Sequence, residues 1–161
     1  MAEESREERL ERETSELFNE LRVVLPGIQV LLAVLLTAPF NQRFSGLSSG
    51  NLAAYTVALG CTAVATALLM APTTFHRIRF RRHDKERLLR LSNLFTVAGT
   101  AFLGAGLTSA IGLVIDLAYG EPWTIVAAVA AALVMGGLWY LVPFSRALGD
   151  GNEETRRGGR R

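Results

Sequence analysis

The sequence predicts an all-α fold, a polytopic membrane protein with four transmembrane helices and an N-terminal amphipathic cytosolic helix. All fifteen acidic and seventeen basic residues lie outside or at the edges of four uncharged runs, residues 23–42, 52–74, 91–115 and 122–145. A bilayer core of about 30 Å needs roughly 20 helical residues, and each run meets that length. In a soluble bundle, four such helices would have no polar face for water, so we expect a membrane protein.

The distribution of basic residues predicts the orientation. Sixteen of the seventeen Lys and Arg residues lie before the first run, between the second and third runs, or after the fourth, and the two other connections hold only Arg43. Segments rich in Lys and Arg stay in the cytosol. We therefore expect a cell-membrane protein with both termini cytosolic, and with residues 43–50 and 117–121 outside.

Residues 1–22 are predicted to form the amphipathic cytosolic helix. Ser5 and Glu8 fit a capping box, and an apolar stripe then follows at near-helical spacing: Leu10, Leu17, Phe18, Leu21 and Leu25. The stripe suits a helix along the membrane surface or the cytosolic loop, or a short coiled coil with a partner. If the helix enters the membrane, Pro26 deprives the carbonyl of Arg22 of its donor, and we expect a bend or break there.

Residues 23–145 are predicted to form one transmembrane domain, with spans at about residues 23–42, 52–74, 91–116 and 122–144. Pro122 follows Gly120 and Glu121, which favours a position in the first turn of the fourth helix. Residues 146–161 are predicted to be a disordered cytosolic tail, because no apolar residue follows Gly149.

Two features inside the spans indicate helix contacts. Thr100, Gly104, Thr108 and Gly112 recur every four positions, and Ala128, Ala132 and Gly136 do the same in the fourth span. Small residues at this spacing let helices approach closely in lipid, so Gly104, Thr108 and Gly112 are predicted packing positions, within one bundle or in a dimer. Gln29 is strongly polar inside the first span and needs a partner, either on another helix or on a substrate or ion.

The segment of residues 75–90 carries a net charge of +5, and residues 1–20 carry −5. A juxtamembrane basic cluster commonly binds anionic lipid headgroups. The predicted contacts are Arg77, Arg79, Arg81, Arg82, Lys85 and Arg87. The same bases could pair with the acidic N-terminal helix, or could serve only to set the topology.

No constellation of residues predicts catalysis, a metal or a cofactor. His76 and His83 lack nearby ligands beyond Asp84, and the one cysteine, Cys61, lies inside the second run. No ionisable group lies inside a span, which argues against a proton-coupled carrier. Nucleic acid is not expected as a partner, because lipid phosphates occupy a basic loop at the bilayer.

Three segments carry a resemblance to a known family: Glu20–Leu31, the Pro39–Phe40 and Arg43–Phe44 pairs, and Phe75–Arg82. Over residues 15–145 the sequence resembles a family of small four-helix membrane proteins from actinobacteria, catalogued as a domain of unknown function. The resemblance implies the same architecture and brings no activity. An excess of Arg over Lys also indicates a bacterial gene.

Together these features favour a non-enzymatic membrane protein with a structural, regulatory or scaffolding role. Its expected partners are membrane lipids, a second copy or another membrane protein. The alternative is a subunit of an oligomeric channel or transporter. A pore would bring Gln29 and the threonines to a shared axis, whereas a scaffold would pair them inside one subunit.

Overall fold

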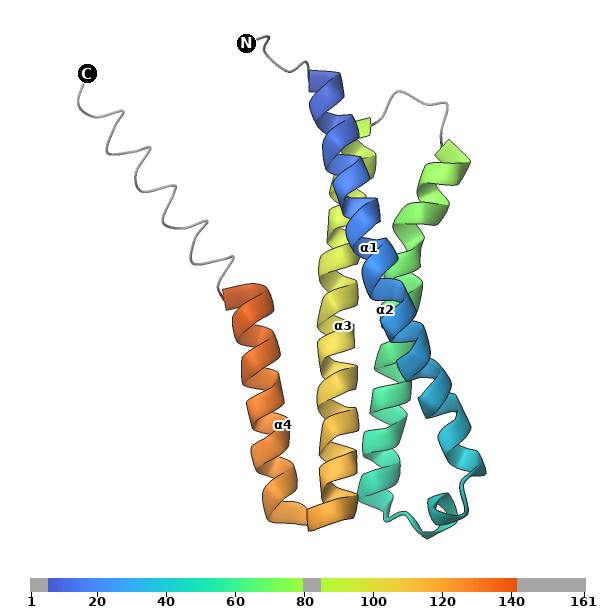
Figure 1. Ribbon diagram of the computed structural model, residues 1–161, viewed down its shortest axis with the longest axis vertical. Helices are drawn as coiled ribbons and strands as arrows, with labels where there is room; N and C mark the ends of the chain where they lie inside the picture. Colours follow the sequence, from blue (N-terminus) through green and yellow to red (C-terminus); the bar gives the residue numbers. More distant parts are fainter. Residues whose placement is uncertain (1–5, 80–84, 142–161) are drawn as a thin grey trace, which may run out of the picture.

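The computed structural model describes residues 6–79 and 85–141 of the chain. Its helices are α1 (Arg6–Thr37), α2 (Ser49–Arg79), α3 (Lys85–Tyr119) and α4 (Glu121–Gly136), with short turns η1 (Ala38–Phe40) and η2 (Gln42–Gly46), and a π-helical turn η3 (Gly137–Leu141) (Figure 1). These described residues contain no strand. The predicted all-α fold is confirmed.

Four helical stretches are long and apolar enough to cross a membrane, and the first and last of them continue from α1 into η1 and from α4 into η3. The stretches are Asn19–Phe40, Ser49–Thr74, Arg90–Tyr119 and Glu121–Leu141. They overlap the four runs expected from the sequence. Pro122 lies within the first two residues of α4, as its position after Gly120 predicted.

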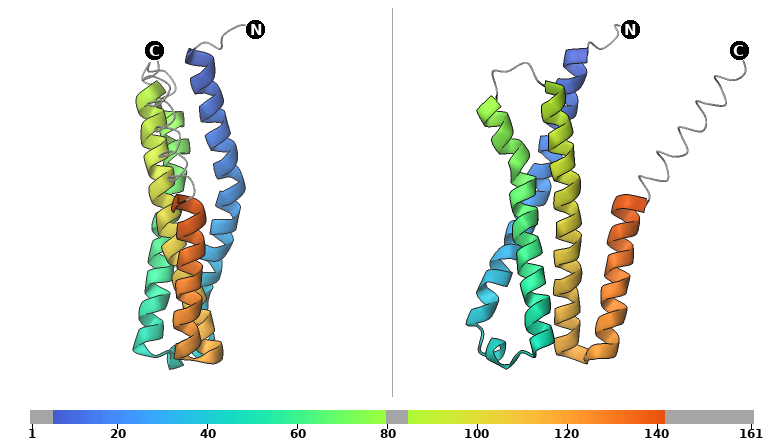
Figure 2. Two further views of the ribbon diagram at one scale, coloured as in Figure 1. Left: turned by 90° about the vertical axis from the view of Figure 1, so that its left-hand side faces the viewer. Right: turned by 180° about the vertical axis from the view of Figure 1, so that it is seen from behind.

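The α2–α3 pair forms the centre of the bundle. These two helices share the most extensive interface, while α1 packs mainly on α2 and less on α3. Among the described helices, α4 packs on α3 alone, and it stands beside the other three in Figures 1 and 2. No residue of α4 is buried. The fourth helix is therefore an attachment to a three-helix core.

Helix α1 continues through Pro26, where the sequence predicted a bend or a break. It runs from Arg6 to Thr37 with Pro26 inside it, so the predicted N-terminal helix and first span are one helix and the possible break is absent. The left view of Figure 2 shows α1 as a curved helix. Leu21 and Ile28, on either side of the proline, are buried in one apolar cluster on α2 and α3. This shared packing holds the two halves together although the proline removes one backbone donor.

A second proline explains how α1 ends. In a regular helix the carbonyl of Leu35 would accept from the N–H of residue 39, which is a proline. The Tyr55 hydroxyl donates to this carbonyl instead, at 2.9 Å in a buried position. The Tyr55 ring also meets Phe44 edge to face, with centroids 4.9 Å apart. Tyr55 thus joins the end of α1 to α2 and to the connection between them.

Glycine lets α3 approach α2 closely. A Cβ at Gly106 would lie 2.8 Å from Oγ1 of Thr62 and 3.3 Å from the backbone oxygen of Ala58. Both of those α2 residues are fully buried. One turn further along, the Ser109 hydroxyl donates to the carbonyl of Ala54 at 2.9 Å. The two backbones are in contact here, and no larger residue would fit at Gly106.

We predict that Tyr55→Phe lowers the stability of the protein in detergent by about 1–3 kcal/mol, because it leaves the buried Leu35 carbonyl without a donor. Tyr119→Phe is the control, since Tyr119 is exposed and its hydroxyl has no hydrogen-bond partner among the described residues. Denaturant unfolding compares the two variants. Equal stability of the two variants would show that the Tyr55 bond does not hold the end of α1.

We also predict that Gly106→Val destabilises the fold by about 1–3 kcal/mol through overpacking of α2 against α3. Gly60→Val on α2 is the matched control, because a Cβ there meets nothing within 4 Å. Thermal unfolding in detergent should show a lower midpoint for the first variant alone. If both variants unfold together, the α2–α3 contact is not tight at Gly106.

Candidate functional site

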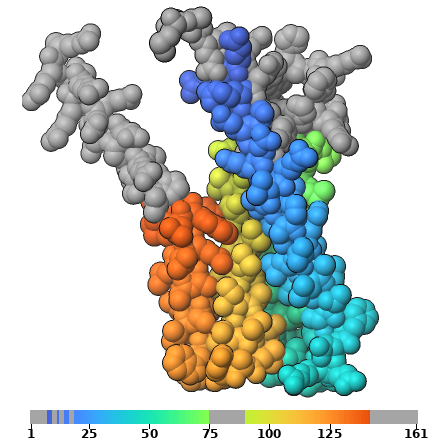
Figure 3. Space-filling view, viewed as in Figure 1, coloured from blue at the N-terminus to red at the C-terminus, as the bar shows by residue number. Residues whose placement is uncertain are grey.

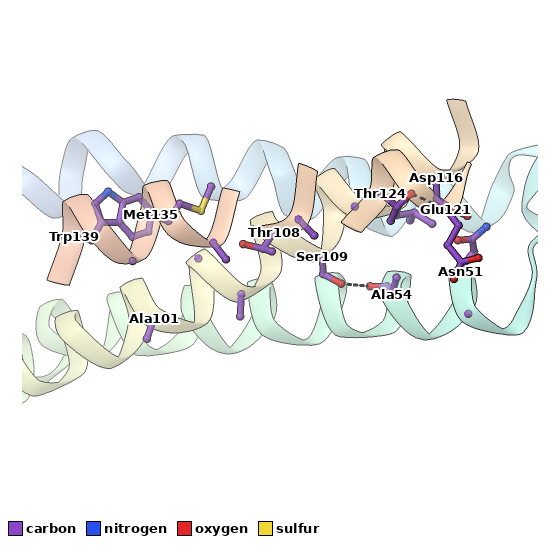
Figure 4. Close-up of a pocket in the computed structure, with 18 of the residues that line it drawn as sticks. Asn51, Ala54, Ala101, Thr108, Ser109, Asp116, Glu121, Thr124, Met135 and Trp139 are labelled. Atoms are coloured by element: carbon purple, nitrogen blue, oxygen red, sulfur yellow. Dashed lines mark hydrogen bonds between the residues drawn. The ribbon is translucent and has the colours of Figure 1, made fainter. Parts of the chain in front are cut away.

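A cavity of about 1080 Å³ lies between α4 and the α2–α3 pair and is here named the α4 groove. Its lining on α3 runs from Thr100 to Asp116, and on α4 and η3 from Thr124 to Tyr140. At about 1.5 Å per residue, each of these walls is about 24 Å long. The first turns of α2 line it from the other side, near Asn51 and Ala54 (Figure 4). The groove thus follows most of the length of a span.

Small residues form the facing walls of the groove. The structure places Gly104, Thr108 and Gly112 on the α3 wall, and the corresponding α4 residues Ala128, Ala132 and Gly136 line the groove as well. A Cβ at Gly112 would lie 3.8 Å from the Cβ of Ala128. A Cβ at Gly104 would lie 3.7 Å from the ring of Trp139. The two stripes recognised in the sequence therefore belong to one interface within the subunit.

A polar cluster closes the end of the groove at the α3–α4 connection. Gly120, at a φ of 85°, is the single residue between the two helices, and this left-handed conformation favours glycine. The Thr124 hydroxyl donates to the Asp116 carboxylate, at 3.0 Å. Asn51 and Glu121 line the same end, as Figure 4 shows. This end offers hydrogen-bonding groups, while the middle offers apolar surface.

Aromatic residues close the opposite end. The Tyr140 hydroxyl donates to the carbonyl oxygen of Val97 at 3.0 Å and lies 2.8 Å from the Thr100 hydroxyl. Both Trp139 and Tyr140 belong to η3, where the helix widens to a π turn directly after Gly136. Helix α4 is therefore bonded to α3 at both ends, with small side chains between the two attachments.

The structure does not bring Gln29 into the groove. Its side chain is exposed on α1, and no hydrogen-bond partner for it is found among the described residues. By contrast, the hydroxyls of Thr62 and Thr66 donate to carbonyls of α2, at 2.7 and 2.8 Å. The interhelical bond considered for Gln29 is thus absent from the described part of the subunit.

The predicted lipid contacts lie at the other margin of the bundle. Arg77 and Arg79 lie at the end of α2, and Lys85 and Arg87 lie in the first turn of α3. Arg81 and Arg82 lie outside the described residues, as does the predicted tail of residues 146–161. Anionic-lipid binding by this segment stays a prediction.

The charged side chains of the groove are confined to one end. Its two carboxylates, Asp116 and Glu121, lie at the polar end, and its middle is lined by Gly, Ala and Thr. No three His, Cys, Asp or Glu residues within the part of the chain that the structure describes come close enough to hold a metal ion. The middle of the groove therefore offers an apolar surface for packing.

The sequence pattern predicts the two small-residue walls of the groove but not its ends. The contribution of Asn51 and Ala54 depends on how α2 packs, which no local pattern encodes. The Tyr140 bond depends on the π turn of η3, and the only local signal was the Gly136–Gly137 pair before it. Aromatic residues at the end of an apolar run are also common at membrane interfaces, so Trp139 and Tyr140 were ambiguous.

Comparisons with curated proteins and with solved structures give no match to this chain. The model of one family matches residues 3–143, a range that includes all four helices and every residue of the α4 groove. That family is described as a family of unknown function, DUF6328, in agreement with the resemblance noted in the sequence. The chain therefore belongs to the family of unknown function DUF6328.

Proposed function

We propose that the chain is an integral membrane protein that acts as a non-enzymatic scaffold, holding a transmembrane helix of a partner membrane protein in the α4 groove. The observation that carries this proposal is a span-length groove with small side chains on both walls. In lipid, helices associate through close backbone approach at small residues, and larger side chains prevent it.

The dimensions of the groove favour a helix as the occupant. Its volume of about 1080 Å³ lies at the upper limit of small-molecule pockets, which span roughly 300–1,000 Å³. Its length follows α3 from Thr100 to Asp116, and its middle carries no charge that would need a counter-ion. A partner helix would pack on Gly104 and Thr108, beside α4, and place its polar end near Asn51.

The alternative function is a subunit of an oligomeric channel or transporter. Such a pore needs free polar side chains that several subunits bring to a shared axis. The hydroxyls of Thr62, Thr66 and Ser109 are instead bonded to carbonyls of the same subunit. This pairing supports the scaffold over the pore, whereas Gln29 and the Thr108 hydroxyl, which have no partner among the described residues, do not add to that support.

We further propose that the protein lies in the cell membrane with both termini in the cytosol. The sixteen-to-one partition of basic residues supports this orientation. In Figure 1 the start of α1, the end of α2 and the start of α3 lie at one end of the bundle, and both short connections lie at the other. Arg43, in η2, is therefore remote from the basic segment, as the charge rule requires.

The orientation predicts the labelling of introduced cysteines in intact cells after Cys61→Ala. Ser45→Cys in η2 and Glu121→Cys at the start of α4 should react with an impermeant maleimide, because both positions are exposed and proposed to be external. Ser15→Cys on α1, also exposed, should react only after the membrane is opened. Labelling of Ser15→Cys alone in intact cells would reverse the orientation.

The groove predicts a specific cross-link. A photoreactive amino acid at Ala105, which lines the groove, should give a protein adduct of discrete mass in native membranes. Ala132→Trp should reduce that adduct about tenfold, because the indole fills the groove against the small wall of α3. Val129→Trp, an exposed position of α4 outside the groove, is the control and should leave the adduct unchanged. Lipid adducts alone, or equal effects of the two tryptophans, would contradict a helix in the groove.

A further inference from the structure

Gln29 is the strongly polar side chain that the subunit leaves in hydrocarbon. It lies at the midpoint of the Asn19–Phe40 span, it is exposed, and no partner for its side chain is found among the described residues. A primary amide has two N–H donors and a carbonyl acceptor, and lipid tails satisfy none of them. The buried side of α1 carries Ile28 and is a different one, so the described residues of the subunit leave the Gln29 amide open to a partner from outside.

Helix α1 has two distinct faces. Leu21, Ile28 and Leu35 are buried in the core clusters. A second set of residues recurs at alternating spacings of three and four and is exposed throughout: Pro26, Gln29, Ala33 and Leu36. This is the repeat by which two helices pack side by side at a small crossing angle. We name this second set the Gln29 face.

A second copy of this chain fits the Gln29 face better than an unrelated helix. Copies inserted in the same orientation can be related by a two-fold axis normal to the membrane, which makes their α1 helices parallel. Such an axis brings both Gln29 side chains to the same depth. Each amide can then donate to the carbonyl of the other, so donor and acceptor are matched by symmetry.

The local shape also permits this contact. Ala33, one turn after Gln29, is small enough for two helices to approach closely. The Gln29 face is remote from the α4 groove, since α4 packs on α3 and has no contact with α1 among the described helices. The space-filling view in Figure 3 shows α1 on the surface, with α3 between it and α4.

We propose that the chain forms a parallel homodimer through the Gln29 face of α1, with the two Gln29 amides hydrogen-bonded to each other in the middle of the bilayer. The proposal rests on the membrane insertion proposed above and is independent of the occupant of the α4 groove. The proposed interface does not involve α4, which has no contact with α1 among the described helices.

The first test is disulfide cross-linking in membranes, in the Cys61→Ala background. Ala33→Cys lies on the Gln29 face, and oxidation should convert it to a covalent dimer. Val34→Cys is the matched control, because it is also exposed but points to a different side of the helix. Equal cross-linking of the two variants, or none at Ala33→Cys, overturns the proposed interface.

The second test measures the monomer–dimer equilibrium in liposomes of defined lipid density by single-molecule photobleaching. Gln29→Leu should raise the dissociation constant about tenfold, the effect expected for losing a pair of interhelical hydrogen bonds, and Gln29→Asn should retain most of the dimer. Because Gln29 is exposed, the leucine variant should keep the thermal stability of the subunit.

One further variant separates this proposal from the proposed scaffold function. Ala132→Trp fills the α4 groove and should leave the dimer intact. If Ala132→Trp dissociates the dimer and Gln29→Leu does not, the two copies associate through the groove, and the Gln29 interface is wrong. If Gln29→Leu dissociates the dimer while the Ala105 cross-link persists, the dimer and the partner site are both supported as separate surfaces.

Discussion

The close approach of α2 and α3 at Gly106 determines the positions of the other two helices. The absence of a side chain there lets the α3 backbone lie against Ala58 and Thr62, and the fully buried residues of α2 follow this line. Helix α1 packs across this pair at Ile28 and buries one side of it. The other side is left to α4, which among the described helices contacts α3 and not α2, and the α4 groove is the space that remains. A wider α2–α3 pair would change both contacts together.

Hydrogen bonding inside the spans follows one rule. At the end of α1, where a proline removes a backbone donor, the Tyr55 hydroxyl donates to the Leu35 carbonyl instead. The hydroxyls of Thr62 and Ser109, inside the spans, donate to a nearby carbonyl, and Thr108 is an exception with no partner among the described residues. Such pairing is required in a medium without water. Gln29, in mid-span, has no such partner among the described residues. An exposed glutamine on a soluble protein would bond to water, but in lipid its amide needs a partner from another molecule.

The helices and their small-residue faces could be predicted from the sequence, but the helix that packs against each face could not. Lipid-facing and core-facing residues are both apolar, so the pattern around a transmembrane helix says little about which side is buried. The stripe at Gly104 and Gly112 therefore indicated a close neighbour without identifying α4 as that neighbour. The exposure of Gln29 could not be predicted for the same reason, since it depends on which side of α1 faces α2. The continuity of α1 through Pro26 depends on packing at Leu21 and Ile28, which is tertiary and not local.

The single-residue connection at Gly120 has a mechanical consequence. It ties the start of α4 to the end of α3, so α4 can separate from α3 only by swinging about that point, as a lever about a hinge. From Gly120 to Tyr140 the lever is about 30 Å long at 1.5 Å per residue, and a rotation of ~10° would displace Tyr140 by about 5 Å. That displacement exceeds what the bonds of Tyr140 to Val97 and Thr100 can tolerate. The hydrogen bonds of Tyr140 therefore limit how far α4 can move away from α3, and with it the width of the groove available to a partner helix.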